Sequence, residues 1–577
     1  MPLPLIALAF LALLAVGYWR YSGFVARQLA LDPAATTPAR AVNDGADFVP
    51  TRPFYLFGQH FSAIAAAGPI AGPILACQTF GWLPCLVWIA LGVVFIGAVH
   101  DFLALAASVR HGARSIAEIA REQLGSPAGR ALLAFIGIAL VYVIVAFTDI
   151  TAGTFVEGSE ELQGSGASFH KGGAVAAASA LYLLLAIVLG LVRKLWPKLP
   201  LWLLTIVFVP ATFGVTWCGT LLADRFVLDH RTWVIVIVAY CGLASITPVS
   251  LLLQPRGYLG GFVLYSALAA GVVGVFLGGP VAGIRIEQPA VNVTPFGGLA
   301  GALGAMFPFL FVTIACGACS GFHGLVCSGT TSKQVDREPH ARPVGYGAML
   351  AEAFVALIAL ATVMTVAPAA IAGRSPGRIY GDGIGRFVTL VIGERHLAFA
   401  TTFGAMAFST FVFDTLDVST RLGRYIAQEL LGWKGRAGSA GATLVTVAAP
   451  LLILLGGEKN DYQRFWTLFG ASNQLLAALT LLTLTVWLRR SGRRFGFALA
   501  PMLFVLAITL WALVRLAVSN FSIVASGGAA GQSIGVALVN GIAACAFVVL
   551  ALFLAAAGAR RLREPRPEHA APVNAHP

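Results

Sequence analysis

Four ionisable residues stand inside or beside long apolar runs of this sequence, and their types are those that carry protons. His60 and His323 border or enter two glycine-rich runs, Asp101 lies in the apolar run 82–108, and Asp417 follows the run 396–413. A charged side chain is costly at membrane depth, so it serves function, forms an interhelical hydrogen bond or snorkels to the interface. Imidazoles and carboxylates in desolvated cavities act as proton relays. We therefore predict a proton path of His60, Asp101, His323 and Asp417.

Two apolar runs contain residues that interrupt helices, at 60–73 and 314–331. Proline removes a backbone donor, and glycine lowers the cost of unwinding. Transporters use such broken helices to offer backbone groups to substrate and ions, whereas small residues can also serve close helix packing. Two Gly-Pro pairs followed by a second glycine-rich break favour transport. The predicted substrate-binding residues are Gly68, Pro69, Gly72, Pro73, Gly317, Ser320, Gly321, Gly329, Thr330, Thr331, Asn473 and Gln474.

No arrangement typical of an enzyme occurs in the sequence. It has no Walker loop and no HExxH motif, and its glycine-rich stretches lie in apolar runs rather than after a strand. The pair Cys316-Gly-Ala-Cys319 has CxxC spacing without a second ligand pair, so we interpret both cysteines as small packing residues. The prediction is a transporter with no catalytic residues, no metal and no cofactor.

The composition requires a membrane protein. Of 577 residues, 58% are hydrophobic and 11% are charged, and the mean hydropathy is +0.84. Because soluble domains carry about 25% charged residues, this excludes a soluble enzyme, a disordered chain and a disulfide-stapled secreted domain. The long continuous apolar runs are also unlike those of a β-barrel. We attribute the net charge of +13 to cytoplasmic loops and not to nucleic-acid binding.

Fifteen apolar segments are candidates for membrane spans. When the loops between them are assigned to alternating sides, one side holds 27 Lys and Arg and the other holds 10. Because basic residues gather in cytoplasmic loops, this predicts an outside N-terminus and an inside C-terminus. The segments cover 2–18, 61–79, 82–108, 131–150, 174–192, 199–218, 232–253, 258–278, 302–328, 346–372, 396–413, 438–456, 466–488, 497–518 and 534–557.

The two interrupted segments are the second and the ninth. They are seven spans apart, so they cross the membrane in opposite directions, as an inverted repeat requires. Five spans per unit give repeats at about 61–218 and 302–488, with two spans between them and two after.

Several longer motifs are spread in order along most of the chain. They are Leu31 to Pro38, Asp44 to Thr51, Leu56 to Phe61, Gly97 to Phe102, Leu253 to Leu259, Ser320 to Lys333, Gly345 to Glu352, Thr415 to Arg421 and Phe469 to Leu475. Together they resemble the carbon starvation protein A (CstA) family of bacterial membrane carriers. The sequence departs from the family pattern where Gln59 replaces an expected histidine and Ser332 replaces a usual proline.

The resemblance implies a carrier of the bacterial inner membrane that takes up peptides or pyruvate during carbon starvation, a stress response. It also implies a LeuT-type core, as in the amino acid–polyamine–organocation superfamily. In such a core the eleventh span often supplies hydroxyls to sodium, so Ser409 and Thr410 keep sodium coupling open.

The combined prediction is an all-α polytopic membrane protein of about 15 helices, with a LeuT-type inverted-repeat core and two broken helices. The resemblance divides it into transmembrane domains at 1–372 and 373–557, with a disordered basic tail at 558–577. The predicted function is proton-coupled symport of pyruvate or short peptides, with a periplasmic N-terminus. Sodium coupling, a channel and a starvation sensor are the alternatives. The expected partners are a small-molecule substrate and membrane lipid, without nucleic acid.

Overall fold

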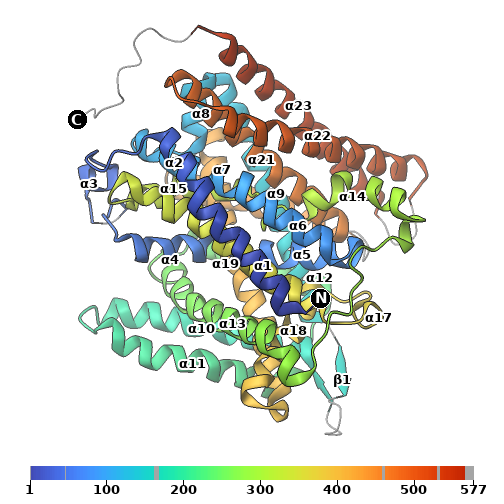
Figure 1. Cartoon of the computed structure of the whole chain (residues 1–577). Coiled ribbons are helices and arrows are strands. Elements are labelled where there is room, and N and C mark those ends of the chain that lie inside the picture. The colour runs from blue at the N-terminus through green and yellow to red at the C-terminus, as the bar shows by residue number, and fades with distance from the viewer. Residues whose placement is uncertain are drawn as a thin grey trace.

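The computed structural model describes residues 2–45, 47–156, 158–161, 168–457, 462–528 and 533–565, and these are mostly helical (Figure 1). Within this part of the chain, the strands form one short antiparallel hairpin. β1 (Ser159–Glu161) pairs with β2 (Ser168–His170), with Ser159 opposite His170. The prediction of an all-α membrane protein is confirmed.

The helices of the first half run from the N-terminus to residue 282. In chain order they are α1 (Leu3–Val16), α2 (Gly23–Leu29), α3 (Pro38–Val42), α4 (Pro53–Ile64), α5 (Gly68–Phe80), α6 (Trp82–Gly92), α7 (Ala98–Arg110), α8 (Ile116–Leu124), α9 (Ser126–Val156), α10 (Lys171–Leu195), α11 (Leu201–Leu221), α12 (His230–Ile246) and α13 (Leu253–Ala282). Short π-helical turns, η1 (Gly17–Ser22) and η2 (Val93–Gly97), join α1 to α2 and α6 to α7 without a loop.

The helices of the second half follow a loop that packs on the turn between α5 and α6. They are α14 (Leu299–Thr313), α15 (Gly321–Gly329), α16 (Ala348–Met364), α17 (Pro368–Ile371), α18 (Pro376–Ile392), α19 (Leu397–Leu431), α20 (Gly435–Leu455), α21 (Tyr462–Arg490), α22 (Gly496–Ala525) and α23 (Ile534–Arg563). Four shorter turns are η4 (Thr294–Phe296), η5 (Thr331–Gln334), η6 (Glu338–His340) and η7 (Arg342–Gly347), while η3 (Ala223–Arg225) follows α11 and η8 (Glu394–His396) precedes α19.

Twelve stretches of the described chain are long and apolar enough to cross a membrane, and the bent pair α4–α5 gives a thirteenth. Two shorter apolar helices, α12 and α14, cover two more of the predicted segments. Each of the fifteen apolar segments therefore overlaps at least one helix. Length and composition support twelve to thirteen spans, so the count of fifteen stays a prediction.

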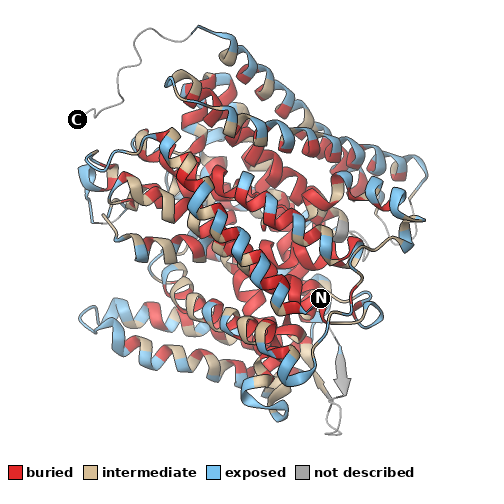
Figure 2. Cartoon of the chain, viewed as in Figure 1, coloured by how far each residue is buried: buried red, intermediate tan, exposed pale blue. Residues whose placement is uncertain are grey.

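Burial separates an inner group of helices from an outer one (Figure 2). The membrane-length part of α21 is buried throughout, whereas only 22% of that part of α11 and 28% of that part of α20 are buried. In Figure 1, α10 and α11 lie at one edge and α22 and α23 at the opposite edge. These outer helices expose many large apolar side chains, as a lipid-facing surface requires, for example Trp202, Ile206 and Val549.

One buried helix lies where the sequence predicted a loop, at 373–395. Ser375 caps α18 by accepting a hydrogen bond from the Arg378 amide at 3.3 Å. Gly381 packs against Ala405 of α19, and Gly383 packs against Thr362 of α16. The glycines allow close packing, but together with charged residues they lower the hydropathy of the segment below that of a span.

The C-terminal helix α23 continues to Arg563, into the segment 558–577 that the sequence predicts to be a disordered tail. Residues 566–577 of that prediction lie outside the described residues.

Candidate functional site

The first predicted break lies at residues 65–67, where α4 ends and α5 begins at an angle of 46°. Pro69 occupies the first turn of α5, where its missing N–H would have had no helical partner. Gly72 and Pro73 follow inside the same helix and are buried. The break thus precedes the Gly-Pro pairs, because Pro69 starts a new helix there instead of interrupting one.

The second predicted break is the non-helical segment 314–320 between α14 and α15. Two neighbouring residues of α21 hold its two ends. Asn473 Oδ1 accepts a hydrogen bond from the Phe322 amide at 2.9 Å, and Asn473 Nδ2 donates to Ser320 Oγ at 3.1 Å. Gln474 Nε2 donates to the Phe311 carbonyl at 2.9 Å. The unwound segment is therefore a defined structure, in which Asn473 caps the start of α15.

The two breaks touch each other at glycine positions. A Cβ added to Gly68 would overlap Cys316, and one added to Gly72 would lie 2.7 Å from the Thr313 carbonyl oxygen. Gly317 has the Pro69 Cα 3.6 Å from the corresponding position. The fold brings together two segments that are about 250 residues apart in the sequence. Where the two segments come closest, only glycine fits.

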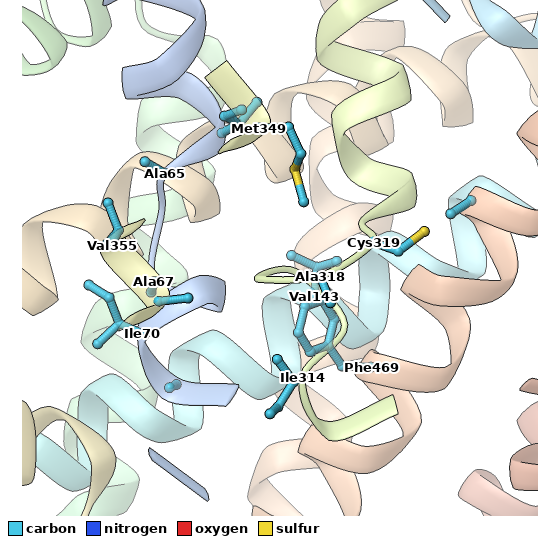
Figure 3. Close-up of a cluster of buried hydrophobic side chains, with 14 of the residues drawn as sticks. Ala65, Ala67, Ile70, Val143, Ile314, Ala318, Cys319, Met349, Val355 and Phe469 are labelled. Atoms are coloured by element: carbon cyan, nitrogen blue, oxygen red, sulfur yellow. The ribbon is translucent and has the colours of Figure 1, made fainter. Parts of the chain in front are cut away.

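Apolar side chains surround this contact (Figure 3). Ala65 and Ala67 lie at the first break, and Ile314 and Ala318 at the second, and all four are buried. Phe469 of α21 lies beside the second break in the same view. The unwound backbone is thus enclosed by protein, which is the condition under which a membrane protein tolerates it.

The remaining predicted binding residues line α15 and its ends. Gly321 packs directly on the α21 backbone at Asn473 and Ala477. Gly329 is the last residue of α15, and the Thr330 hydroxyl donates back to the Val326 carbonyl at 3.1 Å. Gly329 and Thr330 therefore lie at the end of α15 away from the break.

A chain of buried ionisable side chains crosses from α7 through α15 to α16. His323 Nδ1 lies 2.9 Å from Asp101 Oδ2, and His323 Nε2 lies 3.3 Å from Glu352 Oε2. His100 Nδ1 bonds the other oxygen of Asp101 at 2.7 Å. All four side chains are exposed by no more than 2%. One imidazole thus lies between two carboxylates, an arrangement in which a titrating histidine can pass a proton from one carboxylate to the other.

His60 lies next to this chain but makes different bonds. Its Nδ1 lies 2.9 Å from the Thr331 hydroxyl, and its Nε2 lies 3.8 Å from Cys327 Sγ. The structure therefore places three of the four predicted proton-path residues, His60, Asp101 and His323, in one buried region. Thr331 lies beside them.

Asp417 belongs to a different group of residues. Its carboxylate and that of Asp414, both on α19, form ion pairs with Arg256 of α13. Tyr240 of α12 donates to the same Asp417 oxygen at 2.9 Å. No hydrogen bond or ion pair among the described residues joins Asp417 to His323. Asp417 therefore carries protons only if it does so separately from the chain of Asp101, His323 and Glu352.

The two hydroxyl residues assigned to sodium both lie on α19. Ser409 Oγ is 2.7 Å from Ser179 Oγ of α10 and also donates to the Met406 carbonyl at 3.0 Å. The Thr410 hydroxyl is buried, and the described residues give it no hydrogen-bond partner.

The structure adds three residues that sequence reasoning did not assign. Glu352 and His100 are ionisable residues within apolar runs, so the signal was present, but their pairing with His323 and Asp101 needs the fold. Arg256 falls between the apolar segments 232–253 and 258–278, where the sequence predicts a loop, whereas it lies in α13 with 1% exposure.

Two broken helices that meet beside a buried chain of ionisable groups are typical of a membrane transporter. The family model for "Carbon starvation protein CstA" matches residues 3–382 and 365–512, so the chain belongs to the CstA family. The predictions of this family and of a transporter are confirmed.

Several curated relatives cover most of the chain. The peptide transporter CstA of Campylobacter jejuni is 33% identical over 86% of this chain and 78% of its own length. The peptide transporter CstA of Bacillus subtilis is 32% identical over 83% of this chain and 84% of its own. The pyruvate/proton symporter BtsT of Escherichia coli is 30% identical over 88% of this chain and 81% of its own. Among solved structures, an Eremococcus coleocola manganese transporter aligns with a TM-score of 0.48 and 14% identity, over 90% of this chain and 99% of its own.

Proposed function

We propose that the protein is a proton-coupled symporter that takes up a small organic solute, pyruvate or a short peptide, across the bacterial inner membrane. The observation that carries the proposal is the buried Asp101–His323–Glu352 chain beside the two broken helices. Relatives named as peptide transporters and as a pyruvate/proton symporter support the solute class and the coupling ion.

The proton site couples to the break through α15. His323 is two residues beyond Gly321, where α15 begins, whereas Asp101 and Glu352 lie on the longer helices α7 and α16. A shift of α15 changes how His323 meets the two carboxylates. Proton binding and rearrangement of the break would then favour each other, which is the reciprocal linkage that symport requires.

The substrate site in this proposal is the contact between the breaks. Both solute classes carry a carboxylate, and the N-terminal end of a helix attracts negative charge. The start of α5 at Gly68 adjoins the unwound segment 314–320, and Ser320 adds a hydroxyl there. Because the breaks pack against each other, substrate entry requires them to separate, as alternating access between the two repeats of a LeuT-type core would allow.

Sodium coupling is the second candidate. The buried Thr410 hydroxyl has no hydrogen-bond partner among the described residues, and Ser409 and Ser179 place two more hydroxyl oxygens on adjoining helices. Hard cations such as sodium bind oxygen ligands, so this pair of helices is where a sodium ion would be held.

The test is uptake of labelled pyruvate and dipeptides into proteoliposomes under an imposed proton or sodium gradient. The proposal predicts uptake that an inward proton gradient drives and a protonophore abolishes. Uptake that responds to sodium alone would establish the second candidate. Uptake insensitive to both gradients would indicate a channel and overturn the symporter.

A further inference from the structure

A second buried group of side chains shares Asp101 with the proton chain and has the composition of a transition-metal site. Among the described residues, His60, Asp101 and Cys327 each offer one ligand atom, and these atoms lie within 4.8 Å of one another. All three residues are buried. We propose that this group binds a divalent transition-metal ion of the zinc class and that the bound ion inhibits transport.

The hydrogen bond of His60 leaves its Nε2 available to bind a metal ion. Its Nδ1 is 2.9 Å from the Thr331 hydroxyl, and its Nε2 faces Cys327 Sγ at 3.8 Å. With the proton on Nδ1 and donated to Thr331, the Nε2 lone pair points toward the thiol. A metal-binding histidine usually has its second nitrogen held in this way. Zinc lies about 2.0 Å from nitrogen and about 2.3 Å from sulfur, so one ion bridges a gap of this size.

The third ligand is also held by partners. His100 and His323 each bond one oxygen of Asp101, at 2.7 and 2.9 Å, which fixes the orientation of the carboxylate. Metal binding displaces the proton of the Cys327 thiol to solvent, and the resulting thiolate and the Asp101 carboxylate together neutralise a divalent ion, as a buried site requires. Thiolate and imidazole ligands select zinc-like ions over calcium, magnesium and manganese, which prefer oxygen.

The three ligands lie on three different helices, two of which adjoin the breaks. His60 lies on α4 before the first break, Cys327 lies on α15 after the second, and Asp101 lies on α7. An ion bound by all three ties these helices together and occupies the carboxylate that His323 uses. The inhibition rests on the proposed function, whereas the binding does not. The sequence predicted no metal because Cys327 and His60 are 267 residues apart.

The binding test uses the purified full-length protein in detergent, titrated with Co²⁺ and followed by absorption. We expect about one ion per chain with a thiolate-to-cobalt charge-transfer band. In Cys327→Ser the charge-transfer band should disappear, and the affinity for Co²⁺ should fall at least tenfold. Loss of a residue that merely hydrogen-bonds a metal ligand already lowers metal affinity about 10- to 100-fold. Cys85→Ser is the matched control. Cys85, in α6, is equally buried, but its thiol bonds the Gly81 carbonyl and does not belong to the proposed site. Absence of the band in the parent, or its survival in Cys327→Ser, would overturn the proposal.

Zn²⁺ inhibition is measured as the ratio of uptake with and without the ion for each variant, so that a change in basal uptake cancels. The parent and Cys85→Ser should lose at least 90% of uptake at a saturating concentration, while Cys327→Ser and His60→Gln should retain most of theirs. Cobalt binding without inhibition would reject the inhibitory role and keep the site. Uptake with no proton dependence would reject the proposed function and leave the binding result standing.

Discussion

His323 lies within ion-pair distance of both carboxylates of the buried chain, and no other ion pair among the described residues joins the two. Replacing it with glutamine keeps the polar shape but removes the titrating group. We expect His323→Gln to lower proton-driven uptake at least tenfold in proteoliposomes, while substrate exchange without a proton gradient falls less. His396→Gln, a partly exposed histidine in η8 outside the site, is the control. Proton-driven uptake within twofold of the parent would remove His323 from the coupling mechanism.

Arg256 is a residue whose role was not visible in the sequence. It is buried and faces two carboxylates, of which that of Asp417 is fully buried. Removing one partner of a buried ion pair leaves an uncompensated charge and costs about 3–5 kcal/mol. Arg256→Met should therefore lower thermal stability in detergent strongly, whereas Arg231→Met, on an exposed arginine, should not. Equal melting temperatures for the two variants would show that the ion pairs do not stabilise the fold.

At the scale of elements, the contact between the breaks makes a specific prediction about glycine. Gly68→Ala places a methyl group against the Cys316 side chain, and overpacking costs about 1–3 kcal/mol. Shortening the partner in Gly68→Ala/Cys316→Gly should recover much of the lost stability and uptake. Gly72→Ala meets the backbone carbonyl of Thr313, so it has no such rescue.

Gly153→Ala in α9 is the control, because no atom lies within 4 Å of its added Cβ. Melting temperature and uptake are measured for each variant. If Gly68→Ala matched the control in both, the two breaks would not be in contact in the membrane.

The helices show what sequence reasoning could and could not reach. All fifteen apolar segments overlap helices, because continuous apolar runs of this length report burial in lipid or protein directly. The helix α18 buries large side chains such as Ile384 and Phe387, but its four glycines and three charged residues keep the hydropathy of the segment below that of a span. The break before Gly68 was placed too late, since Pro69 is compatible with the first turn of a helix.

The residues of the site could also be predicted only in part from the sequence. His60, Asp101 and His323 could be singled out because ionisable residues are rare in apolar runs. Their partners could not, because which carboxylate meets which imidazole depends on how α7, α15 and α16 pack. For the same reason Asp417 looked equivalent to Asp101 in the sequence, although the fold gives it Arg256 instead.

At the scale of the whole molecule, the segment before α4 ties to the segment after α15. The Thr51 amide donates to the Gln334 carbonyl at 3.1 Å, the Asp32 amide donates to Glu338 at 2.6 Å, and Arg110 pairs with the same Glu338. Arg40 Nε bonds Asp336 at 2.7 Å on the surface of this junction. These bonds lie on the predicted cytoplasmic side and would have to rearrange if that side opens.

The pair of Arg40 and Asp336 predicts a pH dependence. The hydrogen bond from Arg40 lowers the pKa of Asp336 below its usual value. A lowered carboxyl pKa contributes stability that is present above the ordinary pKa and is lost as the pH falls through the folded-state pKa. Asp336→Asn should therefore cost a small amount of stability that is constant between about pH 5 and 8 and shrinks as the pH falls below about 4. Melting temperatures of the parent and variant across this range check it, and a difference that grows on acidification would contradict it.

The central claim is that solute and proton cross together through the region around the two breaks. The most direct measurement is the internal pH of proteoliposomes, read with a trapped dye, after pyruvate or a dipeptide is added outside with no initial pH gradient. Substrate should acidify the interior in the parent protein and should fail to do so in His323→Gln. Substrate accumulation without acidification in the parent would contradict proton symport.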